Sequence, residues 1–258
     1  MKKLLELKNV SLTYYTETDE IQAIKGLTFD CNEGDFLSII GPSGCGKTSI
    51  LSLIAGLLTP TSGKILIDGK ESNSLSESLG YMLQKDHLFN WRTIEKNVFL
   101  PLEIKKICNK ENKKYALDLL NKYGLSDFKK NYPSQLSGGM RQRVALIRTL
   151  ATGPDVLLLD EPFSALDYRT RLIVSDDVYK IIKNEGKSAI LVTHDISEGI
   201  SMSDKVVVLS KRPATVKYIQ YIALRENYNL TSLQTRKVPQ FQTYFDIIWK
   251  EFDLVENK

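Results

Sequence analysis

Residues that build disulfide frameworks or zinc sites are scarce in this sequence. Three cysteines, Cys31, Cys45 and Cys108, and two histidines occur among its 258 residues. The cysteines do not have the paired spacing that a disulfide framework or a cysteine-based zinc site requires. Unpaired cysteines are typical of a reducing compartment, so we expect the protein to be cytosolic.

Long apolar runs are also absent. No stretch approaches the roughly 18 consecutive apolar residues that a membrane-spanning helix needs. The start of the chain carries Lys2, Lys3 and Glu6 and has no continuous apolar segment, which argues against a secretory signal. If the protein works at a membrane, we therefore expect another chain to span it.

A strong excess of charge of one sign is missing as well. Lysine and arginine number 35 against 31 aspartates and glutamates, which gives a formal net charge of +4. The basic clusters are as short as Lys105-Lys106 and Lys113-Lys114. Such clusters indicate a solvated surface, with acidic membrane lipid as the alternative, and we expect no nucleic-acid partner.

The patterns that are present predict an α/β fold. Residues 4–15 and 28–40 have strand patterns, and a turn at residues 32–35 divides the second of them. A helical pattern follows over residues 49–58, and residues 64–67 read as a further strand. The first part of the chain is therefore expected to be rich in strands, with one early helix.

The composition changes near residue 85, where strand patterns give way to helical ones. Three short apolar runs follow this region, at residues 156–159, 188–192 and 206–209, and they suit a parallel sheet covered on both faces. The last part of the chain has aromatic and apolar residues at helical spacing, which favours packing on its own domain over contact with a partner. We expect a core over residues 1–84 and 154–214, an inserted helical lobe over residues 85–153 and a C-terminal extension over residues 215–258.

A glycine-rich motif comes directly after the strand pattern at residues 36–40. It reads Gly41-Pro42-Ser43-Gly44-Cys45-Gly46-Lys47-Thr48 and matches the P-loop pattern. Its glycines allow backbone N–H groups to surround a polyphosphate, while Lys47 meets the β- and γ-phosphates. The helix that begins near Lys47 points its positive dipole end at the same charge. Thr48 and the following Ser49 supply hydroxyls, and Thr48 is expected to bind Mg²⁺.

Two carboxylates end the apolar run at residues 156–159. Asp160 closes a strand that is expected to be buried, where an unpaired carboxylate is costly, so a bound cation is a natural partner. Glu161 follows it and can polarise an attacking water molecule. The alternative interpretation is a pair of carboxylates that cap the loop before Pro162.

A second anion site is predicted at the start of another helical pattern. The segment reads Leu136-Ser137-Gly138-Gly139-Met140-Arg141-Gln142. A serine and two glycines at a helix start present a hydroxyl and backbone N–H groups to a phosphate. The alternative is a plain N-cap on a structural helix.

In this order, the three motifs resemble those of the ATPase subunits of ABC transporters, over roughly residues 4–213. The resemblance implies a P-loop NTPase fold with a mixed sheet, an N-terminal antiparallel β part and an inserted helical lobe. It implies ATP and Mg²⁺ as cofactors, with Asp160 holding the metal and Glu161 acting as general base. It also implies a head-to-tail dimer, in which one copy presents a signature segment to the nucleotide on the other copy: Ser137, Gly138, Gly139 and Gln142.

Four single residues gain roles from this resemblance. His194, which follows the run at residues 188–192, would contact the γ-phosphate and orient water and Glu161, although a lone histidine after a strand is more often structural. Gln84 would sense Mg²⁺ and the attacking water. Asp167 would lie at the dimer seam or be an ordinary helix cap. Tyr14 would stack on adenine or be an exposed strand tyrosine.

A narrower resemblance concerns importers. Residues 88–98 are similar to a segment of nitrate, sulfonate and taurine importers, although Asn90 stands where they usually have proline. Ser197-Glu198-Gly199 also departs from the family's usual Asp-Glu-Ala. The resemblance implies an energy-coupling ATPase subunit at the cytoplasmic face of the membrane, with membrane-spanning permease subunits and an extracellular solute-binding protein as partners. An exporter ATPase and a soluble ABC ATPase are the alternatives, and the transported molecule is not predicted.

Overall fold

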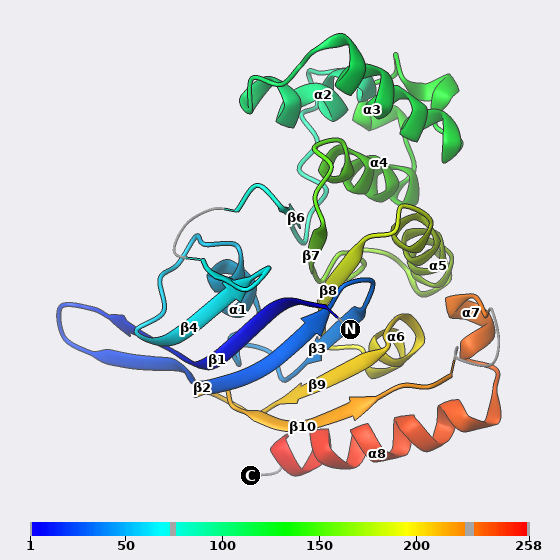
Figure 1. Cartoon of the computed structure of the whole chain (residues 1–258). Helices are drawn as coiled ribbons and strands as arrows, with labels where there is room; N and C mark the ends of the chain where they lie inside the picture. The colour runs from blue at the N-terminus through cyan, green and yellow to red at the C-terminus, as the bar shows by residue number, and fades with distance from the viewer. Residues whose placement is uncertain (1, 73–75, 225–229, 257–258) are drawn as a thin grey trace.

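Two sheets form the centre of the molecule (Figure 1). The computed structural model describes residues 2–72, 76–224 and 230–256. The antiparallel sheet has the order β2-β1-β4-β5 and consists of β1 (Lys3–Tyr15), β2 (Glu20–Asn32), β4 (Ser62–Ile67) and β5 (Lys70–Glu71). The mixed sheet has the order β10-β9-β3-β8-β7-β6 and consists of β3 (Phe36–Ile40), β6 (Leu79–Met82), β7 (Val156–Asp160), β8 (Ser188–Thr193), β9 (Lys205–Leu209) and β10 (Val216–Tyr221).

The inner strands of the mixed sheet, β3, β7, β8 and β9, are buried on both faces, as their continuous apolar runs predict. Its strands are parallel except β10, which pairs antiparallel with β9. Side chains alternate between the two faces: Leu158 packs with the antiparallel sheet and α1 (Lys47–Ile54), whereas Leu157 and Leu159 pack with the helical lobe and α5 (Tyr168–Asn184). The predicted parallel strands are therefore confirmed.

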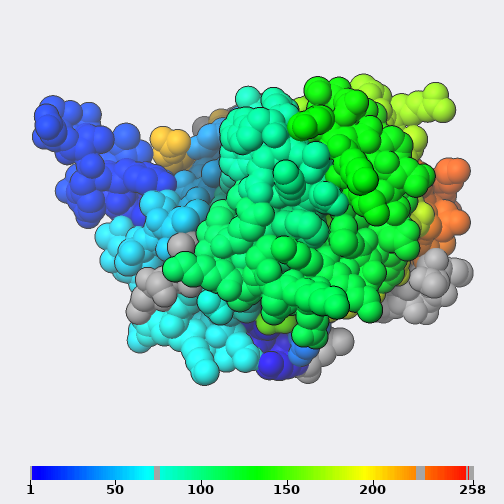
Figure 2. Space-filling view, turned by 90° about the horizontal axis from the view of Figure 1, so that it is seen from above, coloured from blue at the N-terminus to red at the C-terminus, as the bar shows by residue number. Residues whose placement is uncertain are grey.

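The inserted lobe consists of helices, as predicted from composition. It contains α2 (Ile94–Ile104), α3 (Lys110–Lys122) and α4 (Gly138–Leu150), with the short 3-10 turns η1 (Ser126–Phe128) and η2 (Pro133–Gln135). The side chains of Thr93, Asn109 and Ser137 cap the three helices by accepting hydrogen bonds from the first turn. In the space-filling view the lobe lies over the rest of the molecule, while the first two strands project to one side (Figure 2).

The C-terminal segment packs on its own domain. It contains β10, α7 (Ser232–Thr235) and α8 (Pro239–Glu256). Phe241 and Ile248 of α8 are buried in a cluster with α6 (Ile196–Met202) and β9, whereas Trp249 is 53% exposed. The expected extension starts at residue 215 and includes β10, which is hydrogen-bonded to β9 of the mixed sheet.

No helix in the described part of the chain combines the length and the apolar character needed to cross a membrane. The longest helix, α8, has charged residues along its outer side, such as Lys250 and Asp253. This agrees with the scarcity of long apolar runs in the sequence.

Candidate functional site

The predicted phosphate-binding residues gather at one edge of the mixed sheet. The P-loop follows β3, Asp160 and Glu161 stand at the end of β7, and His194 follows β8. These three strands are adjacent and parallel, so their carboxyl ends meet at the same edge. Ligands of open α/β sheets bind at this edge.

The P-loop has the backbone that its glycines allow. Gly44 and Gly46 have φ angles of +73° and +120°, a region that other residues rarely adopt. The turn delivers Lys47 to the first position of α1, where its side chain is only 6% exposed. The Lys47 Nζ donates hydrogen bonds to the carbonyls of Gly41 at 2.8 Å and Pro42 at 3.0 Å, which holds its charge against the loop.

Asp160 and Thr48 lie side by side at the end of β7 and the start of α1. The Thr48 hydroxyl donates to Asp160 Oδ1 at 3.3 Å, and the Tyr81 hydroxyl donates to Oδ2 at 3.3 Å. Burial raises the pKa of the Asp160 carboxyl, while the hydrogen bonds from Thr48 and Tyr81 lower it. A buried carboxylate beside a hydroxyl suits a hard divalent cation. Because water does not solvate it, a buried carboxylate needs a compensating positive charge more than an exposed carboxylate does.

This donor set fits Mg²⁺ in particular. No group of three histidine, cysteine, aspartate or glutamate side chains in the described residues could hold a metal on its own. Mg²⁺ usually takes one or two protein oxygens and completes its shell with substrate phosphates and water. Thr48 and Asp160 beside a P-loop match that pattern.

Glu161 lies between the P-loop lysine and the histidine. Its Oε1 is 3.8 Å from Lys47 Nζ, and its Oε2 is 3.1 Å from His194 Nδ1. The Glu161 backbone has a φ angle of +43°, which is costly for a residue with a side chain, and its N–H donates to the Val192 carbonyl at 2.9 Å. This bond joins the end of β7 to β8 and turns Glu161 towards His194.

Two further predicted residues extend the site. The Gln84 Nε2 donates to the Ser164 hydroxyl at 3.2 Å, and that hydroxyl donates to the Glu161 carbonyl at 3.0 Å. Gln84 is thereby linked to the loop that carries Glu161. The Tyr14 hydroxyl donates to the Ser49 hydroxyl at 3.0 Å, so the ring of this 38% exposed tyrosine stands over the start of α1.

The signature segment lies apart from the chain's own P-loop. Ser137 is exposed and caps α4, and in the described residues no hydrogen bond or ion pair joins Ser137, Gly138, Gly139 or Gln142 to residues 41–49. Gln142 is buried, and its Oε1 has no partner among the described side chains and backbone.

Asp167 shares a surface with the signature segment. It caps α5 by accepting from the Thr170 N–H at 3.0 Å, and this bond lowers the pKa of its exposed carboxyl. A Cβ on Gly138 would come within 3.1 Å of Leu166 Cδ2, which places the two loops in close contact. The structure thus divides the predicted residues into two groups: one around residues 41–49, Asp160, Glu161 and His194, and one around Ser137 and Asp167.

Arg212 was not predicted as a site residue. Its Nη2 donates to the Gly44 carbonyl at 3.0 Å, and it lines a cavity of about 240 Å³ with Lys47, Thr48 and Glu161. The signal in the sequence is its place just after β9, because β9 runs parallel to β3 and ends at the same edge. The arginine adds positive charge at the mouth of the phosphate loop.

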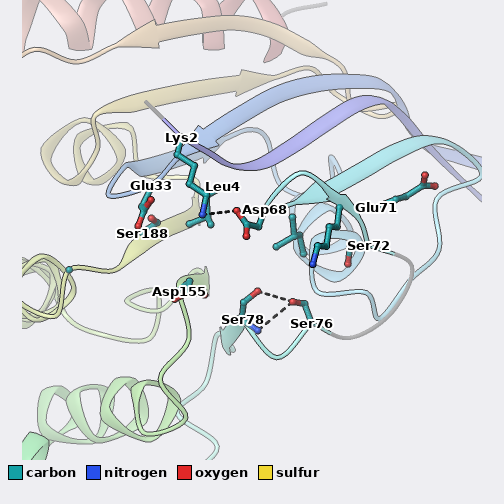
Figure 3. A pocket seen from close by; sticks show the side chains of 13 residues that line it. Lys2, Leu4, Glu33, Asp68, Glu71, Ser72, Ser76, Ser78, Asp155 and Ser188 are labelled. Carbon is teal, nitrogen blue, oxygen red and sulfur yellow. Dashed lines mark hydrogen bonds and ion pairs between the residues drawn. The ribbon is translucent and has the colours of Figure 1, made fainter.

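A larger cavity of about 470 Å³ lies elsewhere (Figure 3). Its lining includes Ser78, Asp155 and Ser188, which come at the amino ends of β6, β7 and β8, and the ion pair of Lys2 with Asp68 at 2.7 Å. This edge is opposite to the carboxyl ends that carry the P-loop and Glu161. The cavity is therefore separate from the phosphate-binding residues.

Comparison with known proteins places this arrangement in a family. Residues 24–164 match the family model described as ABC transporter. The uncharacterized ABC transporter ATP-binding protein YtlC of Bacillus subtilis is 47% identical over 98% of this chain and 97% of its own length. The aliphatic sulfonates import ATP-binding protein SsuB of Bacillus anthracis is 35% identical over 92% of this chain and 96% of its length.

A solved structure agrees with these relatives. A dimeric structure of the ATP-binding cassette MJ0796, in a post-hydrolysis state bound to ADP and Pi, is 33% identical to this chain. The two superpose with a TM-score of 0.71 over 85% of this chain and 99% of that one. The chain belongs to the ABC transporter family and is an ATP-binding subunit with ATPase activity.

Proposed function

We propose that the chain is the ATP-hydrolysing, energy-coupling subunit of an importer for small organic anions of the sulfonate class. The likeness to an ATP-binding protein of aliphatic sulfonate import supports the direction of transport and the substrate class. The subunit would work at the cytoplasmic face of the membrane, bound to membrane-spanning permease subunits that receive cargo from an extracellular solute-binding protein.

The observation that carries the hydrolytic part is the placement of Glu161. Its carboxylate faces His194 on one side and Lys47 on the other, at 3.1 Å and 3.8 Å. A carboxylate next to the γ-phosphate position can take the proton of an attacking water, and His194 orients that water and carboxylate. Lys47 and Arg212 offset the negative charge of the phosphates.

Three other groups complete this proposal. Thr48 and Asp160 would hold Mg²⁺, with Gln84 close to it, and the metal would neutralise charge on the phosphate oxygens. Tyr14 would stack on the adenine ring, with a contribution of roughly 1–3 kcal/mol. The backbone N–H groups of residues 41–49 would surround the phosphates.

The proposal includes a head-to-tail dimer. Within one chain, Ser137 and Asp167 make no bond with the P-loop, although a serine and two glycines at a helix start suit an anion. In a dimer, the group around Ser137 of one copy would close on the nucleotide held by the other. The dimeric state of the related cassette supports this arrangement.

The test is the Glu161→Gln variant, which keeps the shape of the side chain and removes its basicity. We expect ATP binding to remain and hydrolysis to fall by at least about 100-fold, as for loss of a general base. ATP should then convert the variant from monomer to dimer in light scattering. Hydrolysis at the unaltered rate would refute the role of Glu161.

A second measurement tests the transport role. The tagged Glu161→Gln protein is incubated with detergent-solubilised native membranes and Mg-ATP, and the chains that copurify are identified. Recovery of a multi-span permease together with a solute-binding protein would support an importer. Recovery of a permease without one would favour an exporter, and recovery of ribosomes or DNA-repair proteins would refute the transport role while leaving the ATPase mechanism intact.

A further inference from the structure

The C-terminal segment returns to the part of the molecule that carries His194. The short helix α7 contacts both α5 and α6 (Figure 1). The Ser232 hydroxyl donates to the Ser201 hydroxyl at 3.2 Å, and the Leu233 N–H donates to Asp176 Oδ1 at 3.4 Å. Sequence patterns place no function in this segment, yet it adjoins the helix that follows His194.

Arg236, the residue that follows α7, contacts the same hydroxyl of α6. Its Nε donates to the Ser201 hydroxyl at 3.2 Å, and that hydroxyl donates to the Glu198 carbonyl at 3.1 Å. The guanidinium therefore reaches the backbone of α6 through one hydroxyl. Its positive charge also lowers the pKa of the Glu198 carboxyl, which burial and the Asp195 charge raise.

The start of α6 determines where His194 stands. Asp195 caps this helix by accepting from the Glu198 N–H at 3.0 Å, and its own N–H donates to the Thr193 hydroxyl at 3.0 Å. The side chain of His194 is 50% exposed, so little packing holds it in place. Its distance from Glu161 depends on the backbone between β8 and α6.

A second arginine connects the same turn to the loop of Asp167. The Arg171 Nη1 is 3.6 Å from Asp195 Oδ2, and its Nη2 donates to the Leu166 carbonyl at 3.3 Å. Glu198 Oε1 and Arg171 Nε are buried and have no hydrogen-bond partner among the described residues. The polar groups in this cluster are thus incompletely paired among the described residues, and Arg171 joins Asp195 to the loop of Asp167.

We propose that Arg236 is a positioning residue for ATP hydrolysis: through the Ser201 hydroxyl it holds the Glu198 carbonyl in the first turn of α6 and thereby keeps His194 facing Glu161. The C-terminal segment is then part of the hydrolytic apparatus although none of it touches the phosphate loop in the contacts described above. This inference rests on the proposed role of His194.

The experiment compares full-length variants at matched sites. Arg236→Gln removes the charge and the Nε donor, Arg236→Lys keeps the charge, and Lys237→Gln removes an exposed charge at the next position as the control. The concentration of nucleotide-binding sites is measured by titration with labelled ADP, and the hydrolysis rate is divided by it. Unfolded protein is therefore not counted in kcat. Ser201→Ala, which removes the hydroxyl that Arg236 contacts, provides a second variant if Arg236→Gln does not fold.

We expect Arg236→Gln to lower kcat by about tenfold or more with the KM for ATP unchanged, because a small displacement of a catalytic group is costly even when binding is intact. Arg236→Lys should recover part of kcat, and Lys237→Gln should leave it unaltered. An unaltered kcat in both Arg236→Gln and Ser201→Ala would overturn the proposal.

A double-mutant cycle with His194→Ala separates an effect of Arg236 through His194 from an effect on the rest of the protein. If Arg236 acts through His194, Arg236→Gln has no further effect once the histidine is gone. If the double variant instead loses kcat by the product of the two single reductions, Arg236 acts by another route and the inference is overturned. If His194→Ala hydrolyses ATP at the full rate, it is instead the proposed role of His194 that fails, and the role of Arg236 falls with it.

Discussion

At the scale of single residues, the structure explains why glycine stands at position 199, where the family usually has alanine. A Cβ at this position would lie 2.6 Å from Ile40 Cδ1 and 3.2 Å from Ile40 Cγ1. Ile40 is the last residue of β3 and directly precedes the P-loop, and it is fully buried. The glycine therefore follows from the large side chain opposite it, and α6 packs closely on the strand that leads to the phosphate site.

The close packing of Gly199 on Ile40 can be tested by changing each residue alone and then both together. Gly199→Ala should destabilise the protein by about 1–3 kcal/mol through overpacking, and Ile40→Val alone should cost about 0.5–1.5 kcal/mol. The double variant should lose less stability than the sum of the two single losses, because valine lacks the Cδ1 atom that the new methyl group meets. Urea unfolding of the four proteins measures this, and strictly additive losses would show that the two side chains do not compete for the same space.

At the scale of elements, helix N-caps serve both stability and the predicted site. Ser137 caps α4 by accepting from the Met140 N–H at 3.3 Å, and Asn109 caps α3 in the same way from Asn112 at 2.8 Å. Both helices belong to the lobe. Their local chemistry is alike, but only the first has glycines at its first two positions.

Replacing each cap with alanine separates the two roles. Ser137→Ala and Asn109→Ala should each cost about 1 kcal/mol of stability, the usual value of an N-cap. ATP hydrolysis should fall only in Ser137→Ala, because the proposed dimer brings that hydroxyl to the partner's nucleotide. Melting temperatures and ATPase rates at several protein concentrations test both expectations, and an equal loss of hydrolysis in both variants would argue against a trans role for Ser137.

At the scale of the whole molecule, the stability of the fold should depend on a buried carboxyl. Glu198 is 4% exposed, and burial raises the pKa of its carboxyl from its ordinary 4.5 to about 8, with the Asp195 charge adding to the rise. The charges of Arg171 and Arg236 lower this pKa and do not cancel the effect of burial. The folded state therefore holds the Glu198 proton more tightly than the unfolded state does.

The sign of the pH dependence follows from this difference. Below about pH 4.5 Glu198 is protonated in both the folded and the unfolded state, so its ionisation does not change the free energy of unfolding. As the pH rises from there to about 8, Glu198 ionises in the unfolded state but not in the folded state, which lowers the free energy of unfolding. Glu198→Gln cannot ionise, so the wild type should lose on the order of a few kcal/mol relative to the variant between pH 5 and pH 9. Urea midpoints of both proteins across this range measure the difference, and parallel curves would contradict the raised pKa.

Much of the fold and site follows from patterns that are local in the sequence. The glycines that give the loop at residues 41–48 its shape, and the carboxylates that end β7, are visible without a structure because backbone conformation and strand burial depend on nearby residues. Arg212 was missed because its contact with Gly44 joins residues 168 positions apart. Trp249 fits the helical pattern of α8 but is exposed, because periodicity predicts a face of a helix and not its edges.

The sequence by itself determined the class of the fold, the existence of a phosphate loop and the residue types available for hydrolysis. Only the tertiary structure decided that Glu161 meets His194 and Lys47, that Ser137 and Asp167 lie on a surface separate from the P-loop, and that Arg236 reaches α6. The physical reason is that local conformation depends on neighbouring residues, whereas contacts between distant segments depend on the order of strands in the sheet and on how helices pack against it.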